Sequence, residues 1–130
     1  MDSNVLLDVL TRDHVWYPWS SETLEREGQE HALFINIVIY AEISTSFARI
    51  EELDAALADA GIGMRAISTE AAFLAGKCFV RYRKAGGTKA SPLPDFFIGA
   101  QAATEKTKLI TRDAARYRTY FPTVSLIAPP

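Results

Sequence analysis

The sequence predicts an α/β domain in which helices cover a parallel β-sheet. Helix-like and strand-like apolar patterns alternate along the chain, as they do where crossover helices connect parallel strands. The 130 residues, 48% apolar and 23% charged, have the size and composition of one compact domain. No internal repeat or low-complexity tract interrupts the alternation. The simplest assembly is therefore five strands, all parallel, in one sheet.

The first half of the chain contains three predicted strands and two helices. A very short first strand is closed by Asp2, and residues 32–35 form a buried strand that leads into a helix over about 38–47. Apolar residues spaced three or four apart define the next helix, which a pair of glycines stops. Its apolar stripe is Ile50, Leu53, Leu57 and Ala60. A short strand follows near 64–67.

The second half contains three predicted helices and two strands. Thr69 and Glu70 open a helix that ends at a Gly-Gly pair, and Cys78 lies in its apolar stripe, which makes this thiol a core residue. Prolines within 89–94 form a rigid turn into a further helix. The buried face of that helix is Leu93, Phe96, Phe97 and Ala100. The remaining predicted elements are a strand over 108–111, a helix over 113–120 and a strand over 124–127.

Charge is distributed unevenly along the chain. The formal net charge is only −2, yet residues 77–118 hold ten of the fourteen Lys and Arg residues and three of the sixteen Asp and Glu residues. Lys77, Arg81 and Lys84 fall on a common outward helix face. This asymmetry is compatible with a surface that binds a polyanion and equally with ordinary solvated helix faces.

Cysteine content and hydropathy indicate a cytoplasmic protein. A single cysteine cannot form an internal disulfide, so nothing ties the chain to an oxidising compartment. The longest apolar run, about 32–43, is too short to cross a bilayer and contains polar residues, and the first residues lack the pattern of a signal peptide.

Four carboxylates from separate segments fall near the predicted carboxyl ends of the strands, where open parallel sheets bind ligands. They are Asp2, Glu42, Asp95 and Asp113. Taken singly, three of them have ordinary interpretations as helix caps or solvated residues. Glu42 differs, because an unpaired carboxylate inside the apolar segment 37–43 would be desolvated at considerable cost, so we expect a positive group to face it.

A divalent cation would meet that need if the other acids converge on Glu42. Carboxylate oxygens suit Mg²⁺ or Mn²⁺, whereas two His and one Cys at scattered positions cannot assemble a zinc site. Such an ion lowers the pKa of a bound water and polarises a phosphoryl oxygen, so phosphodiester hydrolysis is the chemistry that this set of residues favours. One ion and two ions are equally compatible with the sequence.

Four segments in this order resemble those of the PIN-domain proteins, in particular the VapC-like toxins of bacterial toxin-antitoxin pairs. The segments are MDSNVLLD (1–8), IVIYAEI (37–43), LPDFFIGA (93–100) and LITRD (109–113), and the chain closes with YFPTVSLI (120–127). The resemblance covers essentially the whole chain and keeps the motif order.

The resemblance implies a single PIN domain over 1–130 that acts as a Mg²⁺- or Mn²⁺-dependent endoribonuclease. It implies a three-layer sandwich around a parallel sheet of order 3-2-1-4-5, a homodimer, and inhibition by a cognate antitoxin whose tail enters the acidic groove. The implied catalytic and metal-binding residues are Asp2, Glu42, Asp95 and Asp113. Asn4 and Thr111 would orient these ligands, and Asp8 is expected to be structural. The candidate RNA contacts are Lys77, Arg81, Lys84, Arg112 and Arg116.

Two positions depart from the family pattern. Only Met1 precedes Asp2, where family members usually have several apolar residues, so the first strand is nearly absent. Many relatives carry an acid or Asn a few residues after the fourth carboxylate, whereas this chain has Ala114, Ala115 and Arg116. The second departure leaves the number of metal ions open.

The remaining candidates have alternative interpretations. The aromatic cluster at 16–19 could stack on RNA bases or pack a helical lid or an interface, and His14 and His31 are expected to be solvated. A non-catalytic PIN-fold module that binds RNA or protein is the main alternative function, and a DNA-directed nuclease would share the same chemistry. A phospho-accepting receiver domain is excluded, because the adjacent acids and the lysine that it needs are missing from the strand ends.

Overall fold

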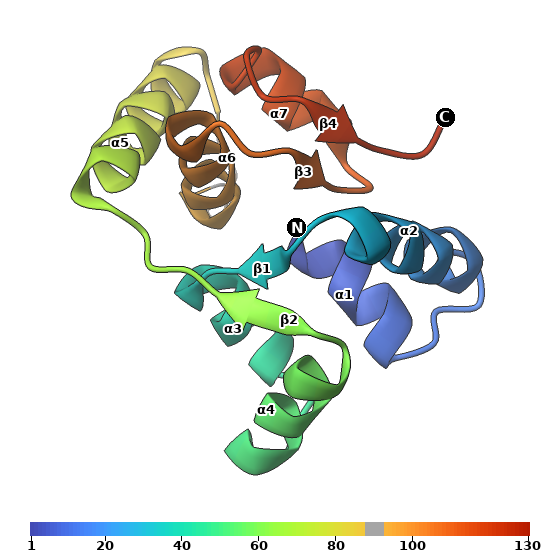
Figure 1. The fold of residues 1–130 in the computed structure, drawn as a ribbon. Coiled ribbons are helices and arrows are strands. Elements are labelled where there is room, and N and C mark those ends of the chain that lie inside the picture. Colours follow the sequence, from blue (N-terminus) through green and yellow to red (C-terminus); the bar gives the residue numbers. More distant parts are fainter. Residues whose placement is uncertain (88–92) are drawn as a thin grey trace.

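Short strands and longer helices alternate through the computed structural model, which describes residues 1–87 and 93–130 (Figure 1). Within these ranges there are seven helices and four strands. The helices are α1 (Ser3–Leu10), α2 (Tyr17–Glu30), α3 (Ile37–Ser44), α4 (Ile50–Asp59), α5 (Thr69–Lys84), α6 (Leu93–Glu105) and α7 (Ala114–Tyr120). The strands are β1 (Leu33–Ile35), β2 (Ile62–Met64), β3 (Leu109–Ile110) and β4 (Leu126–Ile127). Most of the predicted turn over 89–94 lies outside the described residues.

The strands form two parallel pairs. Leu33 of β1 is in register with Ile62 of β2, and Leu109 of β3 with Leu126 of β4. The predicted parallel pairing is therefore confirmed, while the single five-stranded sheet of order 3-2-1-4-5 is not. Strands of two or three residues form few ladder hydrogen bonds, so the described residues show two separate two-stranded sheets.

The start of the chain lies between these two sheets (Figure 1). The amino group of Met1 donates a hydrogen bond to the Phe34 carbonyl oxygen in β1 at 3.3 Å. The backbone N–H of Asp2 donates to the carbonyl oxygen of Ile110 in β3 at 2.8 Å. Residues 1–2 thus hold the two sheets together without forming a strand, because α1 begins directly at Ser3. This position brings Asp2 to the boundary between the two halves of the molecule.

Local sequence signals fix the helix ends. The side chains of Asn36 and Ser68 accept hydrogen bonds from the third backbone N–H beyond them and so cap α3 and α5. Gly61 and Gly86 have φ values of +70° and +89° just after α4 and α5, a conformation that glycine adopts without strain. Helix α3 is shorter than the predicted 38–47 and ends at Ser44. Helices α1 and α2 were not predicted, because the first residues resemble a strand end.

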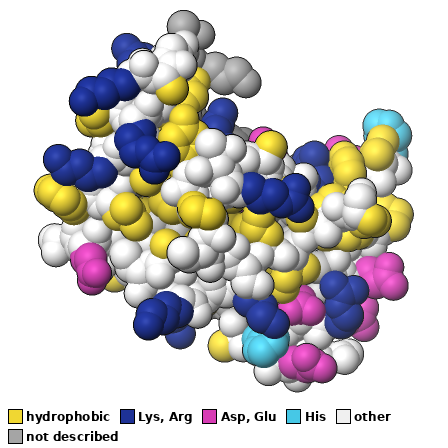
Figure 2. Space-filling view, turned by 90° about the horizontal axis from the view of Figure 1, so that it is seen from above, with side chains coloured by type: hydrophobic (Ala, Val, Ile, Leu, Met, Phe, Trp, Pro, Cys, Tyr) yellow, Lys and Arg dark blue, Asp and Glu magenta, His cyan; other side chains and the backbone are white. Residues whose placement is uncertain are grey.

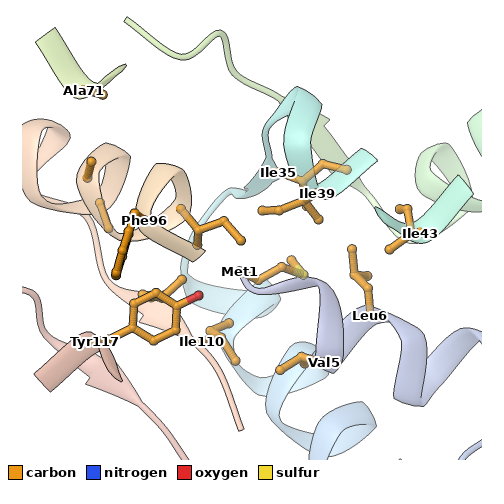
Figure 3. Close-up of a cluster of buried hydrophobic side chains, with 14 of the residues drawn as sticks. Met1, Val5, Leu6, Ile35, Ile39, Ile43, Ala71, Phe96, Ile110 and Tyr117 are labelled. Carbon is orange, nitrogen blue, oxygen red and sulfur yellow. The ribbon is translucent and has the colours of Figure 1, made fainter. Parts of the chain in front are cut away.

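The hydrophobic core runs across both sheets and is built largely from helix faces. Figure 3 shows buried side chains from α1, β1, α3 and α6 that converge around Met1. Phe96 of α6 is fully buried and packs against the rings of Phe79, Tyr82, Tyr120 and Phe121 with centroid distances of 5.1 to 6.4 Å. Cys78 is 3% exposed, so its predicted core position is confirmed. No helix within 1–87 or 93–130 combines the length and hydropathy needed to span a membrane.

Candidate functional site

Asp2 is a buried carboxylate held by neutral donors. It lies at the N-terminus of α1 and is 4% exposed. Its Oδ2 accepts hydrogen bonds from Thr111 Oγ1 at 2.8 Å, from the Tyr117 hydroxyl at 3.0 Å and from Asn4 Nδ2 at 3.4 Å. These donors come from three parts of the chain, and Asn4 and Thr111 contact Asp2 as the resemblance implied. Together they fix the orientation of the carboxylate.

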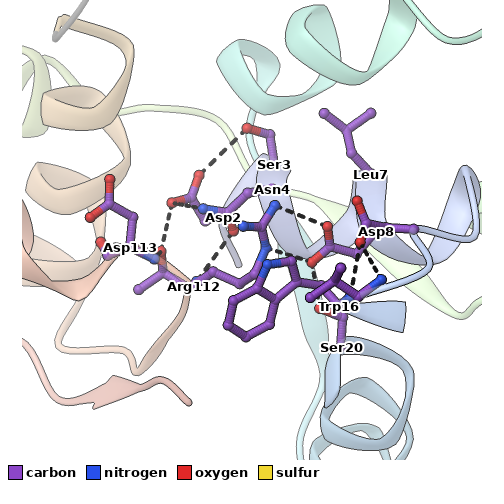
Figure 4. A network of polar contacts seen from close by, with 12 residues as sticks. Asp2, Ser3, Asn4, Leu7, Asp8, Trp16, Ser20, Arg112 and Asp113 are labelled. Atoms are coloured by element: carbon purple, nitrogen blue, oxygen red, sulfur yellow. Dashed lines mark hydrogen bonds and ion pairs between the residues drawn. The ribbon is translucent and has the colours of Figure 1, made fainter. Parts of the chain in front are cut away.

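Glu42 of α3 lies beside Asp2, and Ser3 connects the two. The Ser3 hydroxyl is 2.9 Å from Glu42 Oε1. It is also 3.5 Å from Asp2 Oδ1 (Figure 4). Burial raises the pKa of Glu42, the charge of Asp2 raises it further, and the Ser3 hydrogen bond opposes both. The expected positive partner of Glu42 is not found among residues 1–87 and 93–130. Glu42 is only half-buried and keeps part of its hydration, which lowers the cost of leaving it without a cationic side chain.

Asp95 is the third carboxylate of the group, and its side chain forms an ion pair with Arg116. It stands in the first turn of α6, where burial raises its pKa to about 6, with further contributions from the charges of Asp2 and Glu42. Arg116 of α7 donates a hydrogen bond from Nη1 to Asp95 Oδ2 and opposes this shift. Asp2, Glu42 and Asp95, which we term the acidic site, therefore lie close enough for the charge of Asp2 to raise the pKa of both Glu42 and Asp95.

Asp113 stands apart from these three. Its side chain is exposed and makes no capping hydrogen bond to α7, although it precedes that helix. Its backbone N–H donates to Thr111 Oγ1 at 3.0 Å, and this same hydroxyl donates to Asp2 (Figure 4). Asp113 is thus connected to the acidic site through Thr111. The fourth predicted ligand lies at its edge.

The donor atoms of the acidic site suit a hard divalent cation, but the present positions of its side chains do not. Its donors are all oxygens, and burial together with the charge of Asp2 raises the pKa of Glu42 and Asp95, a cost that a cation would relieve. In the described ranges, however, no three Asp, Glu, His or Cys side chains are positioned to share a metal ion. Asp95 instead pairs with Arg116. Binding of a metal ion therefore requires side chains to move.

Arg112, a candidate RNA contact, has a structural partner. Its Nε and Nη2 donate to the two carboxylate oxygens of Asp8 at 2.7 and 3.0 Å, and its guanidinium lies 5.0 Å from the ring centroid of Trp16 (Figure 4). Asp8 is 2% exposed and also accepts a 2.6 Å hydrogen bond from Ser20. The structural role expected for Asp8 is confirmed: it ties α1 to α2 and to the segment after β3.

The other basic candidates form a stripe along α5. Lys77, Arg81 and Lys84, which we term the basic stripe, are all exposed, and Figure 2 shows Lys and Arg side chains among hydrophobic ones on this side of the molecule. Lys77 lies over the Phe73 ring at 5.0 Å and Arg81 over the Tyr120 ring at 5.4 Å.

Aromatic rings connect the basic stripe to the acidic site. The Tyr120 ring packs edge-on against Tyr82 at 6.3 Å, and Arg116 lies over Tyr82 at 5.9 Å. Arg116 then reaches Asp95. A positively charged surface with exposed or half-buried aromatic rings thus leads to the carboxylates.

Two residues in contact with the acidic site were not predicted. Ser3 bridges two carboxylates, and Tyr117 donates to Asp2 from α7. Burial first, then the charges of Asp2 and Asp95, raise the pKa of the Tyr117 phenol, so it remains a donor. A helical spacing of four residues places Tyr117 on the same side of α7 as Asp113, and this signal could have identified it.

Comparison with known proteins identifies a family and similar folds. The family model described as PIN domain matches residues 1–122. The chain is similar to a structure of VapBC2 from Rickettsia felis bound to a DNA fragment from their promoter, with a TM-score of 0.73, 17% identity, and coverage of 99% of this chain and 96% of the other. It is also similar to a toxin-antitoxin complex from Klebsiella pneumoniae, with a TM-score of 0.70, 20% identity, and coverage of 99% and 95%. No curated protein matches the chain.

Proposed function

The chain belongs to the PIN domain family, and we propose that it is a metal-dependent endoribonuclease that acts as the toxin of a toxin-antitoxin pair. The observation that carries the proposal is the convergence of Asp2, Glu42 and Asp95 from three segments. Gathering these carboxylates costs free energy, because burial and the charge of Asp2 disfavour ionisation of Glu42 and Asp95. Perturbed carboxylates of this kind are typical of functional sites.

The residues that would hold Mg²⁺ or Mn²⁺ are the acidic site, with Asp113 at its edge. When bound, the metal would polarise the scissile phosphate and favour attack by water. Thr111, Tyr117, Asn4 and Ser3 hold Asp2 and Glu42 in fixed orientations. At Asp2 and Glu42 the protein would thereby supply oriented negative charge, whereas Asp95 would have to leave Arg116 to join them.

The basic stripe would bind the RNA backbone and guide it toward the carboxylates. Phosphate contacts by Lys and Arg are independent of sequence, and aromatic rings near the path would stack on unpaired bases. Arg116 at the end of this path donates to Asp95 through one nitrogen, so its other guanidinium N–H groups would contact phosphate. Because Arg112 is paired with the buried Asp8, its predicted contact with RNA would use only the part of the guanidinium that faces solvent.

The test of catalysis compares single substitutions in vitro. We expect Asp95→Asn and Asp113→Asn to abolish Mg²⁺-dependent cleavage of RNA while the far-UV circular dichroism spectrum stays unchanged. Asp59→Asn is the matched control, since Asp59 is exposed at the end of α4. Cleavage that survives both substitutions in the presence of a chelator would contradict the proposal. Single-stranded DNA of the same sequence, assayed in parallel, separates a ribonuclease from a DNA-directed nuclease.

The toxin role is tested in cells and with a partner. The two similar structures are, by their descriptions, VapBC2 and a toxin-antitoxin complex, which supports a cognate antitoxin for this chain. Induced expression in the bacterial cytoplasm should arrest growth, and Asp95→Asn should not. Co-expression with the cognate antitoxin should restore growth, and light scattering should give the mass of a homodimer. Equal growth with both forms would count against a toxin.

A non-catalytic PIN-fold module that binds RNA or protein is the second candidate, and one observation favours it. Arg116 already neutralises part of the acidic charge, and no three carboxylates in the described ranges share a metal position. A module of this kind predicts that Mg²⁺ and Mn²⁺ leave the melting temperature unchanged. An enzyme that binds them predicts a rise, because a ligand that binds only the folded state stabilises it.

A further inference from the structure

Arg116 occupies a special place among the basic residues. It donates to Asp95 Oδ2, and Asp95 in turn lies close enough to Asp2 and Glu42 for their charges to raise its pKa. Among residues 1–87 and 93–130, the ion pair between Arg116 and Asp95 is the only one that involves a carboxylate of the acidic site. Arg116 is therefore the side chain that brings positive charge into contact with that site.

An ordinary ion pair that ties α7 to α6 is the alternative interpretation. The comparison with Arg112 argues against it. Arg112 binds Asp8 through two nitrogens, and the buried Asp8 also accepts a hydrogen bond from Ser20. Arg116 binds Asp95 through one nitrogen. The side chains of Arg116 and Asp95 are 21% and 28% exposed, respectively. Asp95 also belongs to a group of three carboxylates. A single, partly hydrated contact is easier to exchange than a buried bidentate one.

We propose that Arg116 is the counterion that stabilises the acidic site when no metal is bound, and that a divalent cation must displace Arg116 from Asp95. This inference rests on the proposed metal site and deepens it. The Asp95 oxygen that accepts from Arg116 is a donor that the metal requires, and two cations repel each other at contact distance. Arg116 is thus a positioning residue that lowers the affinity of the site for metal.

The metal occupancy of the acidic site would then depend on the ion pair between Arg116 and Asp95 as well as on the concentration of the metal ion. With Arg116 in place, the three carboxylates tolerate one another in the absence of metal. When the ion enters, the guanidinium is released at the junction with the basic stripe, next to Tyr82. The same change that loads the metal therefore adds a positive charge to the proposed RNA path.

Direct binding of Mn²⁺, measured by isothermal titration calorimetry without RNA, tests the proposal. We expect Arg116→Gln to bind Mn²⁺ about tenfold more tightly than the unsubstituted protein, because it removes one positive charge within contact distance of a ligand. Arg118→Gln is the matched control, since Arg118 lies on the same helix and is exposed. It should change the affinity less than about twofold. Equal or weaker binding by Arg116→Gln overturns the proposal.

A second measurement covers the case in which Arg116→Gln does not fold. In the unsubstituted protein, the Nε–H resonance of Arg116, assigned with the charge-conserving Arg116→Lys variant, should shift when Mg²⁺ is added. A resonance that does not move while Mg²⁺ binds overturns the proposal. If both the unsubstituted protein and Arg116→Gln bind Mn²⁺ equally, only the role of Arg116 is wrong. If neither binds, the metal site is wrong and the inference falls with it.

Discussion

Replacement of Tyr117 by Phe tests whether the hydrogen bonds to Asp2 hold the two halves of the molecule together. The substitution removes one hydroxyl, which donates to Asp2 Oδ2 at 3.0 Å, and leaves the ring that fills the core. A hydrogen bond to a charged group contributes about 1.5–3 kcal/mol to the free energy of unfolding. Asp2 is buried, so water cannot easily replace the lost donor.

That loss corresponds to a fall in melting temperature of about 6–12 °C, if a domain of this length loses about 4 °C per kcal/mol. Differential scanning calorimetry of the metal-free protein measures it. Tyr120→Phe is the matched control, because Tyr120 lies on the same helix and its hydroxyl has no hydrogen bond to the described residues. A melting temperature for Tyr117→Phe within about 2 °C of that of the control would refute the reasoning.

Four further predictions follow from the same contacts. Asp8→Asn should lower the free energy of unfolding, measured by urea denaturation, by about 1.5–3 kcal/mol, because it removes the charged acceptor of two Arg112 hydrogen bonds. A loss below about 1 kcal/mol, the range of an exposed ion pair, would contradict this role. Gly99→Ala should cost about 1–3 kcal/mol in the same assay, since a Cβ there would lie 2.3 Å from the Phe121 ring. The affinity for Mn²⁺ should fall about tenfold per pH unit below about pH 6, where Asp95 is protonated, and a flat calorimetric profile from pH 5 to 7 would exclude Asp95 as a ligand. Without metal, the contribution of Asp95 to the free energy of unfolding should decrease as pH rises from 3.8 to about 6. The reason is that the carboxyl group keeps its proton to a higher pH in the native state than in the unfolded state. This trend should disappear in Asp95→Asn.

The basic stripe gives a prediction about salt dependence, which belongs with the RNA-binding part of the proposal. Combined Gln substitutions at Lys77, Arg81 and Lys84 should weaken binding of single-stranded RNA and reduce the slope of log affinity against log salt concentration by about 2. Arg49→Gln, at the exposed start of α4, is the control. Fluorescence anisotropy at several salt concentrations measures both slopes, and an unchanged slope would place the RNA path elsewhere.

Local patterns in the sequence were sufficient for several elements. The stripe with spacings of three and four residues predicted α4, and the end of that helix before Gly61 is as expected. The start of α5 at Thr69 follows from Ser68, which caps it. These features are decided within one or two helical turns, so the rest of the fold has little influence on them.

The strands were predicted less well. The segments 32–35, 108–111 and 124–127 each contain an observed strand, but the strands are only two or three residues long. The start of the chain, expected to be a short strand, bonds to β1 and β3 through Met1 and Asp2 and then turns at once into α1. Strand length depends on partners that are distant in sequence, which a local apolar run does not reveal.

The order of residues along the chain was enough to predict which residue types could form the site: four carboxylates in a fixed order, oxygen donors suited to a hard cation, and a basic second half. Tertiary structure decided that Asp2, Glu42 and Asp95 meet while Asp113 remains exposed. It also decided that Arg112 pairs with Asp8 and Arg116 with Asp95. The physical reason is that an ion pair between side chains 21 or 104 positions apart depends on how helices pack, and packing is a property of the whole core.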